Sequence, residues 1–110
     1  RETEEEVGLA RRHVEIVGRL AQYVVRTGFT VTPVVGMVTP PFALIPDPHE
    51  VAEIFEVPLD FLVDPANHQR HSRDVGGRPR EFYAIPYRGY YIWGATAGML
   101  VNLSEVLRRR

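Results

Sequence analysis

The stretch Arg1-Glu2-Thr3-Glu4-Glu5-Glu6-Val7-Gly8-Leu9 opens the sequence and decides both the expected fold and the expected chemistry. On an α-helix the side chains of Glu2, Glu5 and Glu6 share one face, because they lie three and four residues apart. Three carboxylates on one face repel each other unless a cation neutralises them, and such oxygen ligands suit Mg²⁺ or Mn²⁺. Arg1 lies four residues before Glu5 and can orient that carboxylate through a charge-assisted hydrogen bond. The alternative is a solvated acidic helix end with a surface pair worth about 0.2–0.5 kcal/mol.

Composition limits the class of protein. The 110 residues are enough for one small domain or part of one, and a hydrophobic content of 45% is enough for a core. The 13 basic and 14 acidic residues nearly cancel, so no excess of positive charge indicates a nucleic-acid partner. Without cysteine there is no disulfide and no thiolate metal site. No apolar run is long enough to span a bilayer, so we expect no membrane partner and a cytoplasmic location.

The rest of the chain alternates between strand-like and helix-like patterns. We expect a helix end over 1–12, strands over 13–20, 21–25, 29–38, 51–57, 81–87 and 90–93, a short helical turn over 58–62 and a helix over 95–109. The proline-rich stretch over 39–48 predicts a loop, and the polar stretch over 64–80 predicts a loop or a hairpin tip. Pro33 should lie at an edge, a bulge or a strand start. These elements predict an α+β or mixed α/β domain.

The opening stretch resembles the second half of the metal-binding signature of the Nudix hydrolases. That signature ends in Arg-Glu, an aliphatic residue, any residue, Glu-Glu, any residue, Gly and an aliphatic residue. The chain matches it at Arg1, Glu2, Glu5, Glu6, Gly8 and Leu9. Thr3 stands where an aliphatic residue is usual, and the upstream Gly and Glu of the signature are absent.

The resemblance implies a Nudix-type mixed β-sheet sandwiched between helices, truncated at its N-terminus. Residues 1–110 would then be the C-terminal portion of a single Nudix hydrolase domain. Such a portion leaves strand edges exposed, which favours pairing with another chain and leaves a homodimer open. We therefore expect the 110 residues alone to be poorly stable or inactive.

Three further blocks resemble the coenzyme A pyrophosphatase branch of this family. They are Gly28–Gly36, Glu50–Leu59 and Tyr91–Leu100, and with the opening stretch they span nearly the whole chain. The resemblance implies a small-molecule substrate, coenzyme A or an acyl derivative, cleaved at its diphosphate to 3′,5′-ADP and 4′-phosphopantetheine or its acylated form. The alternatives are another nucleoside diphosphate derivative, such as ADP-ribose or NADH, and a Nudix-like nucleotide-binding domain without turnover.

The family's roles carry over to matching positions. Glu6 would be the firmest ligand of Mg²⁺ or Mn²⁺, Glu5 a second ligand, and Glu2 either a ligand or the base that activates water. Nudix enzymes often recruit another acidic residue from a later segment, for which Glu50 and Glu53 are the local candidates. The alternative for both is a solvent-facing position on an ordinary strand.

The remaining polar and aromatic residues have competing interpretations. His68 and His71 lack the spacing of a zinc site and are better explained as residues of a solvated loop. The arginines of the polar stretch could recognise the 3′-phosphate of coenzyme A, although a flexible charged loop is the favoured interpretation; they are Arg70, Arg73, Arg78 and Arg80. One of the aromatic residues over 83–93 could stack on adenine, but packing within a hairpin is more usual. The small residues over 94–98 indicate close packing of the last helix.

Overall fold

The computed structural model describes residues 14–25, 28–39, 44 and 54–109. These residues form short antiparallel ladders and helices, so the α+β expectation is confirmed. Contacts divide the chain into two compact units, Arg1–Arg19 with Val34–Glu56 and Leu20–Pro33 with Val57–Arg110. Among the described helices, none has the length and apolar character needed to cross a membrane.

The first unit contains a ladder of two strands. Strand β1 (Val14–Arg19) pairs antiparallel with β4 (Val34–Val38), and the register shifts between Ile16 and Gly18. Such a shift is a β-bulge, which increases the local twist of a strand. The strand predicted over 13–20 is thereby confirmed.

The second unit begins with a smaller ladder, in which β2 (Tyr23–Val24) pairs with β3 (Thr30–Val31). The single strand predicted over 29–38 is wrong, because Thr32 and Pro33 separate β3 from β4. Pro33 has no N–H to donate to a ladder, and its carbonyl instead accepts a hydrogen bond from the Leu20 N–H at 2.9 Å. Pro33 therefore directly precedes a strand, one of the places expected for it.

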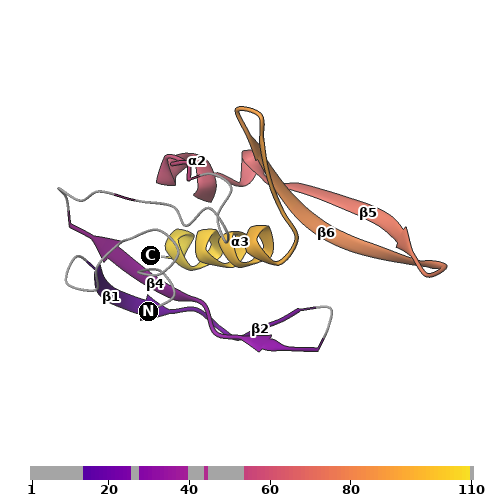
Figure 1. The fold of residues 1–110 in the computed structure, drawn as a ribbon, viewed down its shortest axis with the longest axis horizontal. Coiled ribbons are helices and arrows are strands. Elements are labelled where there is room, and N and C mark those ends of the chain that lie inside the picture. Colours follow the sequence, from indigo (N-terminus) through magenta and orange to yellow (C-terminus); the bar gives the residue numbers. More distant parts are fainter. Residues whose placement is uncertain (1–13, 26–27, 40–43, 45–53, 110) are drawn as a thin grey trace. The chain divides into compact units, whose positions relative to one another are not determined.

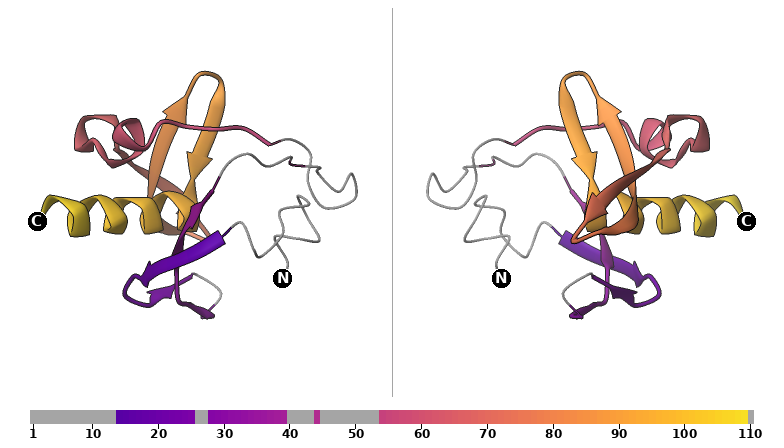
Figure 2. Two further views of the ribbon diagram at one scale, coloured as in Figure 1. Left: turned by 90° about the vertical axis from the view of Figure 1, so that its left-hand side faces the viewer. Right: turned by 90° about the vertical axis from the view of Figure 1, so that its right-hand side faces the viewer.

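The second unit continues with α2 (Leu59–Val63), the 3₁₀ turn η2 (Pro65–Asn67) and a three-stranded sheet. In that sheet β6 (Arg78–Tyr87) is central, between β5 (Gln69–Val75) and β7 (Tyr90–Trp93) (Figure 1). Helix α3 (Gly94–Arg108) follows directly and packs against β6 and β7 (Figure 2). The predicted aromatic hairpin, the short helical turn and the last helix are all confirmed.

Two predicted elements are wrong in the described part of the chain. The strand predicted over 51–57 is absent over 54–57, and residues 51–53 lie outside the described residues. β-Branched residues favour a strand only where a neighbouring strand provides a ladder. The polar stretch over 64–80 is not a loop throughout, since residues 69–75 are strand β5. Most of β5 is exposed, so it lacks the apolar alternation that identifies a half-buried strand. The hairpin tip expected there is present at Gly76 and Gly77, which both have positive φ angles.

The core of the second unit lies between the sheet and α3. Ala84 and Ile85 of β6 and Ala97 of α3 are fully buried, and Val101 is nearly so. The hydroxyl of buried Ser104 donates a hydrogen bond to the Val63 carbonyl at 2.5 Å, which joins α3 to the end of α2. The close packing predicted for the small residues over 94–98 is confirmed for Ala97 and Gly98, which are buried, whereas Gly94 and Ala95 are half-buried and Thr96 is exposed.

Candidate functional site

The carboxylates predicted to bind metal lie outside the described residues. This holds for Arg1, Glu2, Glu5 and Glu6 of the opening stretch and for the further candidates Glu50 and Glu53. Within the part of the chain that the structure describes, no cluster of His, Asp or Glu side chains could hold a metal ion. The predicted metal site therefore remains a prediction from the sequence.

The described residues form a different feature, a groove of about 490 Å³ in the second unit. This volume is within the range of small-molecule sites, roughly 300–1,000 Å³. Its walls come from β2 and the residue after it, from β5 and β6, and from the junction of β7 with α3. The lining residues are Tyr23, Val24, Val25, Arg73, Val75, Arg80, Glu81, Phe82, Trp93, Gly94 and Ala95.

The pairing of β5 with β6 decides which side chains share a face. Residues directly opposite each other in an antiparallel ladder point to the same side, and the side alternates along each strand. Arg73 is opposite Arg80, and Val75 is opposite Arg78. These three arginines therefore lie on one face of the hairpin, and that face carries no acidic residue over 69–75 and 78–82.

Aromatic rings continue the same face. Phe82 is opposite His71, and their rings lie 5.5 Å apart. Trp93 is opposite Ala84, two residues along β6 from Phe82, and its ring meets Phe82 edge to face at 5.8 Å. The Arg73 guanidinium carbon lies 5.9 Å from the centre of the Trp93 ring. We refer to Arg73, Arg78, Arg80, His71, Phe82 and Trp93 as the arginine face.

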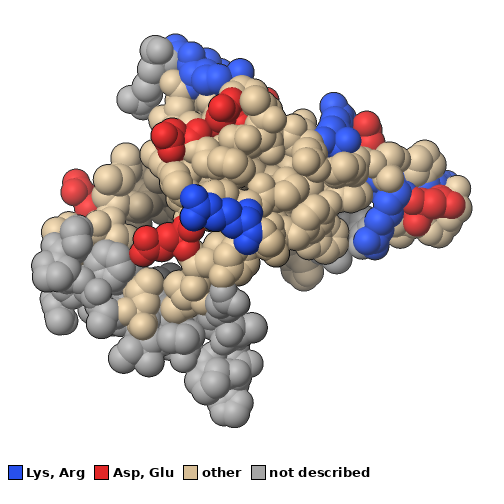
Figure 3. All heavy atoms as spheres, turned by 90° about the horizontal axis from the view of Figure 1, so that it is seen from above, with Lys and Arg blue, Asp and Glu red and all other residues tan. Residues whose placement is uncertain are grey.

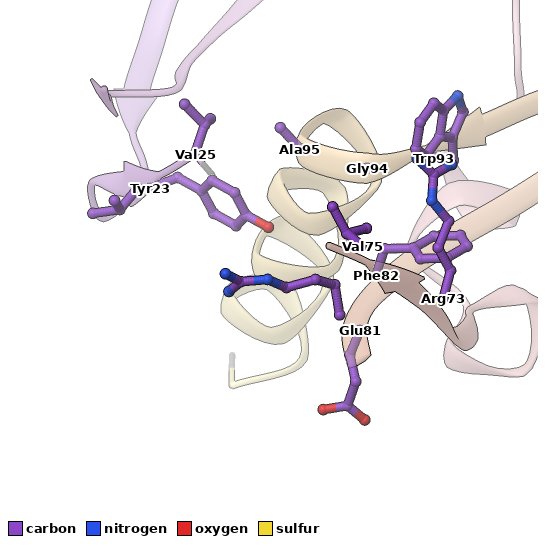
Figure 4. Close-up of a pocket in the computed structure, with 11 residues that line it drawn as sticks. Tyr23, Val25, Arg73, Val75, Glu81, Phe82, Trp93, Gly94 and Ala95 are labelled. Carbon is purple, nitrogen blue, oxygen red and sulfur yellow. The ribbon is translucent and has the colours of Figure 1, made fainter. Parts of the chain in front are cut away.

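The opposite face of the hairpin has a different charge pattern. It carries Arg70, Asp74 and Glu81, and Arg70 donates a hydrogen bond of 2.9 Å to Glu81 in an ion pair. Figure 4 shows the Glu81 carboxylate directed away from the rings of Phe82 and Trp93, although Glu81 also lines the groove. Figure 3 shows basic and acidic side chains next to each other along the hairpin, at the right of that view.

The structure changes the interpretation of the polar stretch. Its four arginines lie on strands rather than in a flexible loop, and three of them are on one face. His68 is half-buried, and its Nε2 lies 2.7 Å from the Leu62 carbonyl, so it belongs to the packing around α2. His71 lies on β5 rather than in a loop, although it is exposed as predicted. A signal in the sequence was the alternation of Arg78, Arg80 and Phe82, which places them on one side of a strand.

Comparison with known proteins finds relatives among the Nudix hydrolases. No protein-family model matches the chain. An uncharacterized Nudix hydrolase, NudL, of Photorhabdus laumondii is 37% identical over 107 residues, which cover 96% of this chain and 56% of the relative. The peroxisomal coenzyme A diphosphatase NUDT7 of Mus musculus is 34% identical over 113 residues, covering 97% of this chain and 48% of the relative. Nudix hydrolase 15, mitochondrial, of Arabidopsis thaliana is 33% identical over 116 residues, covering the whole chain and 41% of the relative.

These similarities agree with the α+β architecture and with the half signature over residues 1–9. All three relatives are named as Nudix hydrolases or as a diphosphatase, and each match covers nearly the whole chain. Along nearly its whole length the chain is therefore similar to Nudix hydrolases. It spans about half the length of the curated relatives it matches.

Proposed function

We propose that this chain is part of a metal-dependent pyrophosphohydrolase that cleaves the diphosphate of coenzyme A or acyl-coenzyme A. The products would be 3′,5′-ADP and 4′-phosphopantetheine, acylated or not. The observation that carries the proposal is the carboxylate set Glu2, Glu5 and Glu6 in the matched half of the Nudix signature. Similarity over 97% of the chain to a relative named as a coenzyme A diphosphatase supports the choice of substrate.

The donor set fits a hard divalent cation. Glu2, Glu5 and Glu6 offer only carboxylate oxygens, which Mg²⁺ and Mn²⁺ prefer, and the chain has no cysteine to favour a softer metal. A cation bound there would neutralise charge on the phosphoryl oxygens and lower the pKa of a bound water.

The proposed roles of the protein residues follow from the family pattern. Glu6 and Glu5 would hold the cation, and Glu2 would be a ligand or would accept the proton of the attacking water. Arg1 would orient Glu5 through a charge-assisted hydrogen bond. Glu50 or Glu53 would supply a further carboxylate, and both are weaker candidates because neither belongs to the signature.

The experiment uses the complete encoded protein with Mg²⁺ or Mn²⁺. Coenzyme A, acetyl-coenzyme A, ADP-ribose and NADH are incubated separately, and the products are separated by chromatography. We expect 3′,5′-ADP from coenzyme A and acetyl-coenzyme A, and its release should require the carboxylate of Glu6. Cleavage of ADP-ribose or NADH instead would contradict the substrate class. Binding of a nucleotide that stays intact with either metal would contradict hydrolysis altogether.

A further inference from the structure

The arginine face of the β5–β6 hairpin brings like charges together. Arg73 and Arg80 are directly opposite in the ladder, an arrangement that is unfavourable when both side chains are charged. Neither makes an ion pair within the described part of the chain, whereas Arg70 on the other face is paired with Glu81. The hairpin therefore has both of its carboxylates, Asp74 and Glu81, on one face and leaves the arginines of the other face open to an anion.

Guanidinium groups in this arrangement suit a phosphate monoester. Such a phosphate carries about −1.5 to −2 charges at pH 7, and arginine can bind its oxygens through two parallel hydrogen bonds. Because Arg73 and Arg80 are opposite each other in the ladder, their long side chains can turn toward one dianion and make two charge-assisted contacts with it.

The rings beside these arginines suit a planar base. Trp93 is 50% exposed, so part of its indole surface is available to a ligand. Phe82 meets this indole edge to face and the Arg73 guanidinium lies near it, so the ring is held in place from two directions (Figure 4). Stacking of a base on an aromatic side chain contributes roughly 1–3 kcal/mol in nucleotide-binding proteins.

We propose that the arginine face binds an adenosine nucleotide that carries a phosphate monoester. Arg73 and Arg80 hold the phosphate, and Trp93 stacks on the base within the groove that these residues line. Coenzyme A has such a group, the 3′-phosphate of its adenosine, and the assignment of this ligand to the substrate rests on the proposed function. A nucleic-acid strand fits less well, because the other face of the hairpin carries Asp74 and Glu81 and the chain has a net charge of −1.

The test measures binding without catalysis. The complete protein is titrated with 3′,5′-ADP and with adenosine, which has the base but no phosphate, in EDTA by isothermal titration calorimetry. The variants are Arg73→Gln, Arg80→Gln and Trp93→Ala, and the matched control is Arg70→Gln, which removes the same charge from the opposite face of the same hairpin. We expect 3′,5′-ADP to bind about tenfold more tightly than adenosine, and each of Arg73→Gln and Arg80→Gln to lower the affinity for 3′,5′-ADP about tenfold. Trp93→Ala should weaken the binding of both ligands, and Arg70→Gln should change neither affinity.

Three outcomes would reject the proposal. Equal affinities for the wild type and for Arg73→Gln and Arg80→Gln would overturn it, and so would an equal loss in Arg70→Gln. Tighter binding of a ten-residue oligothymidine than of 3′,5′-ADP would assign the face to single-stranded nucleic acid instead. Release of 3′,5′-ADP from coenzyme A is measured separately with metal. If the protein cleaves coenzyme A but the arginine variants bind normally, the proposed function stands and this inference is wrong. If the arginine variants bind weakly but the protein does not cleave coenzyme A, only the proposed hydrolysis is wrong.

Discussion

Among the described glycines, Gly98 is the one with the least room for a side chain. A Cβ placed on Gly98 would overlap the hydroxyl and ring of Tyr23, so the close approach of β2 to α3 depends on a glycine in the middle of a helix. Glycine there lowers helix propensity by about 1 kcal/mol relative to alanine. The tertiary contact with Tyr23 therefore requires a residue that is unfavourable for the helix itself.

We predict that Gly98→Ala destabilises the protein in spite of its better helix propensity. Overpacking typically costs about 1–3 kcal/mol, which exceeds the propensity gain unless Tyr23 moves away. Urea denaturation should show the loss, and the same substitution in a Tyr23→Ala background should be neutral or stabilising. A stabilising effect in both backgrounds would mean that Tyr23 does not pack on Gly98.

Ser104 illustrates a polar residue in the core that is satisfied by one bond. It is fully buried, and its hydroxyl donates to the Val63 carbonyl. We predict that Ser104→Ala lowers the free energy of unfolding by about 1–3 kcal/mol, because the half-buried Val63 carbonyl loses this donor. Chemical denaturation measures the change, with Ser72→Ala on exposed β5 as the control expected to have little effect. A change of equal size in both variants would argue against the bond.

At the scale of elements, the two hairpins of the three-stranded sheet have turns of the same kind. Gly76 and Gly77 join β5 to β6, and Arg88 and Gly89 join β6 to β7, all with positive φ angles. Positive φ at both central residues matches the twist of the strands, and Asn-Gly is a favoured pair for such turns. Arg88, with φ of 46°, is the non-glycine exception among the described residues.

We predict that Arg88→Asn stabilises the β6–β7 hairpin. A left-handed conformation costs most residues roughly 1–2 kcal/mol, and asparagine tolerates it better. The gain should be about 0.5–1 kcal/mol in thermal or urea unfolding, reduced by loss of the contact between the Arg88 guanidinium and the Tyr87 ring at 5.3 Å. A clear loss of stability would show that the ring contact outweighs the turn preference.

These elements also show how far the sequence predicts the fold. The aromatic strands around Arg88-Gly89 and the apolar period of the last helix are strong local signals, and both elements are where they were expected. Strand β5 could not be predicted in the same way, because its charged, exposed residues become a strand only through the ladder with β6. Likewise, the sharing of one face by Arg73 and Arg80 depends on a register that the turn at Gly76 and Gly77 fixes.

At the scale of the whole molecule, the likeness to a protein family and the proposed metal chemistry rest on different evidence. The likeness to Nudix hydrolases extends along nearly the whole chain, and the described structure agrees with an α+β class. The proposed metal chemistry rests on the spacing of Glu2, Glu5 and Glu6, which places them on one face if the stretch is a helix. The arginine face could be assembled only from the register of the hairpin, since its arginines in the sequence alone also fit a charged loop.

The central claim is that the signature carboxylates, rather than the acidity of the stretch, support cleavage of coenzyme A. Glu4 provides the matched control, because it lies in the same run but outside the signature. The measurement is kcat/KM for release of 3′,5′-ADP from coenzyme A by the complete protein with Mg²⁺ or Mn²⁺, for the wild type, Glu6→Gln and Glu4→Gln. We predict a loss on the order of 100-fold or more in Glu6→Gln, as expected for removal of several kcal/mol of metal stabilisation, and a change of less than about threefold in Glu4→Gln. Equal rates in all three proteins, or equal losses in the two variants, would contradict the account.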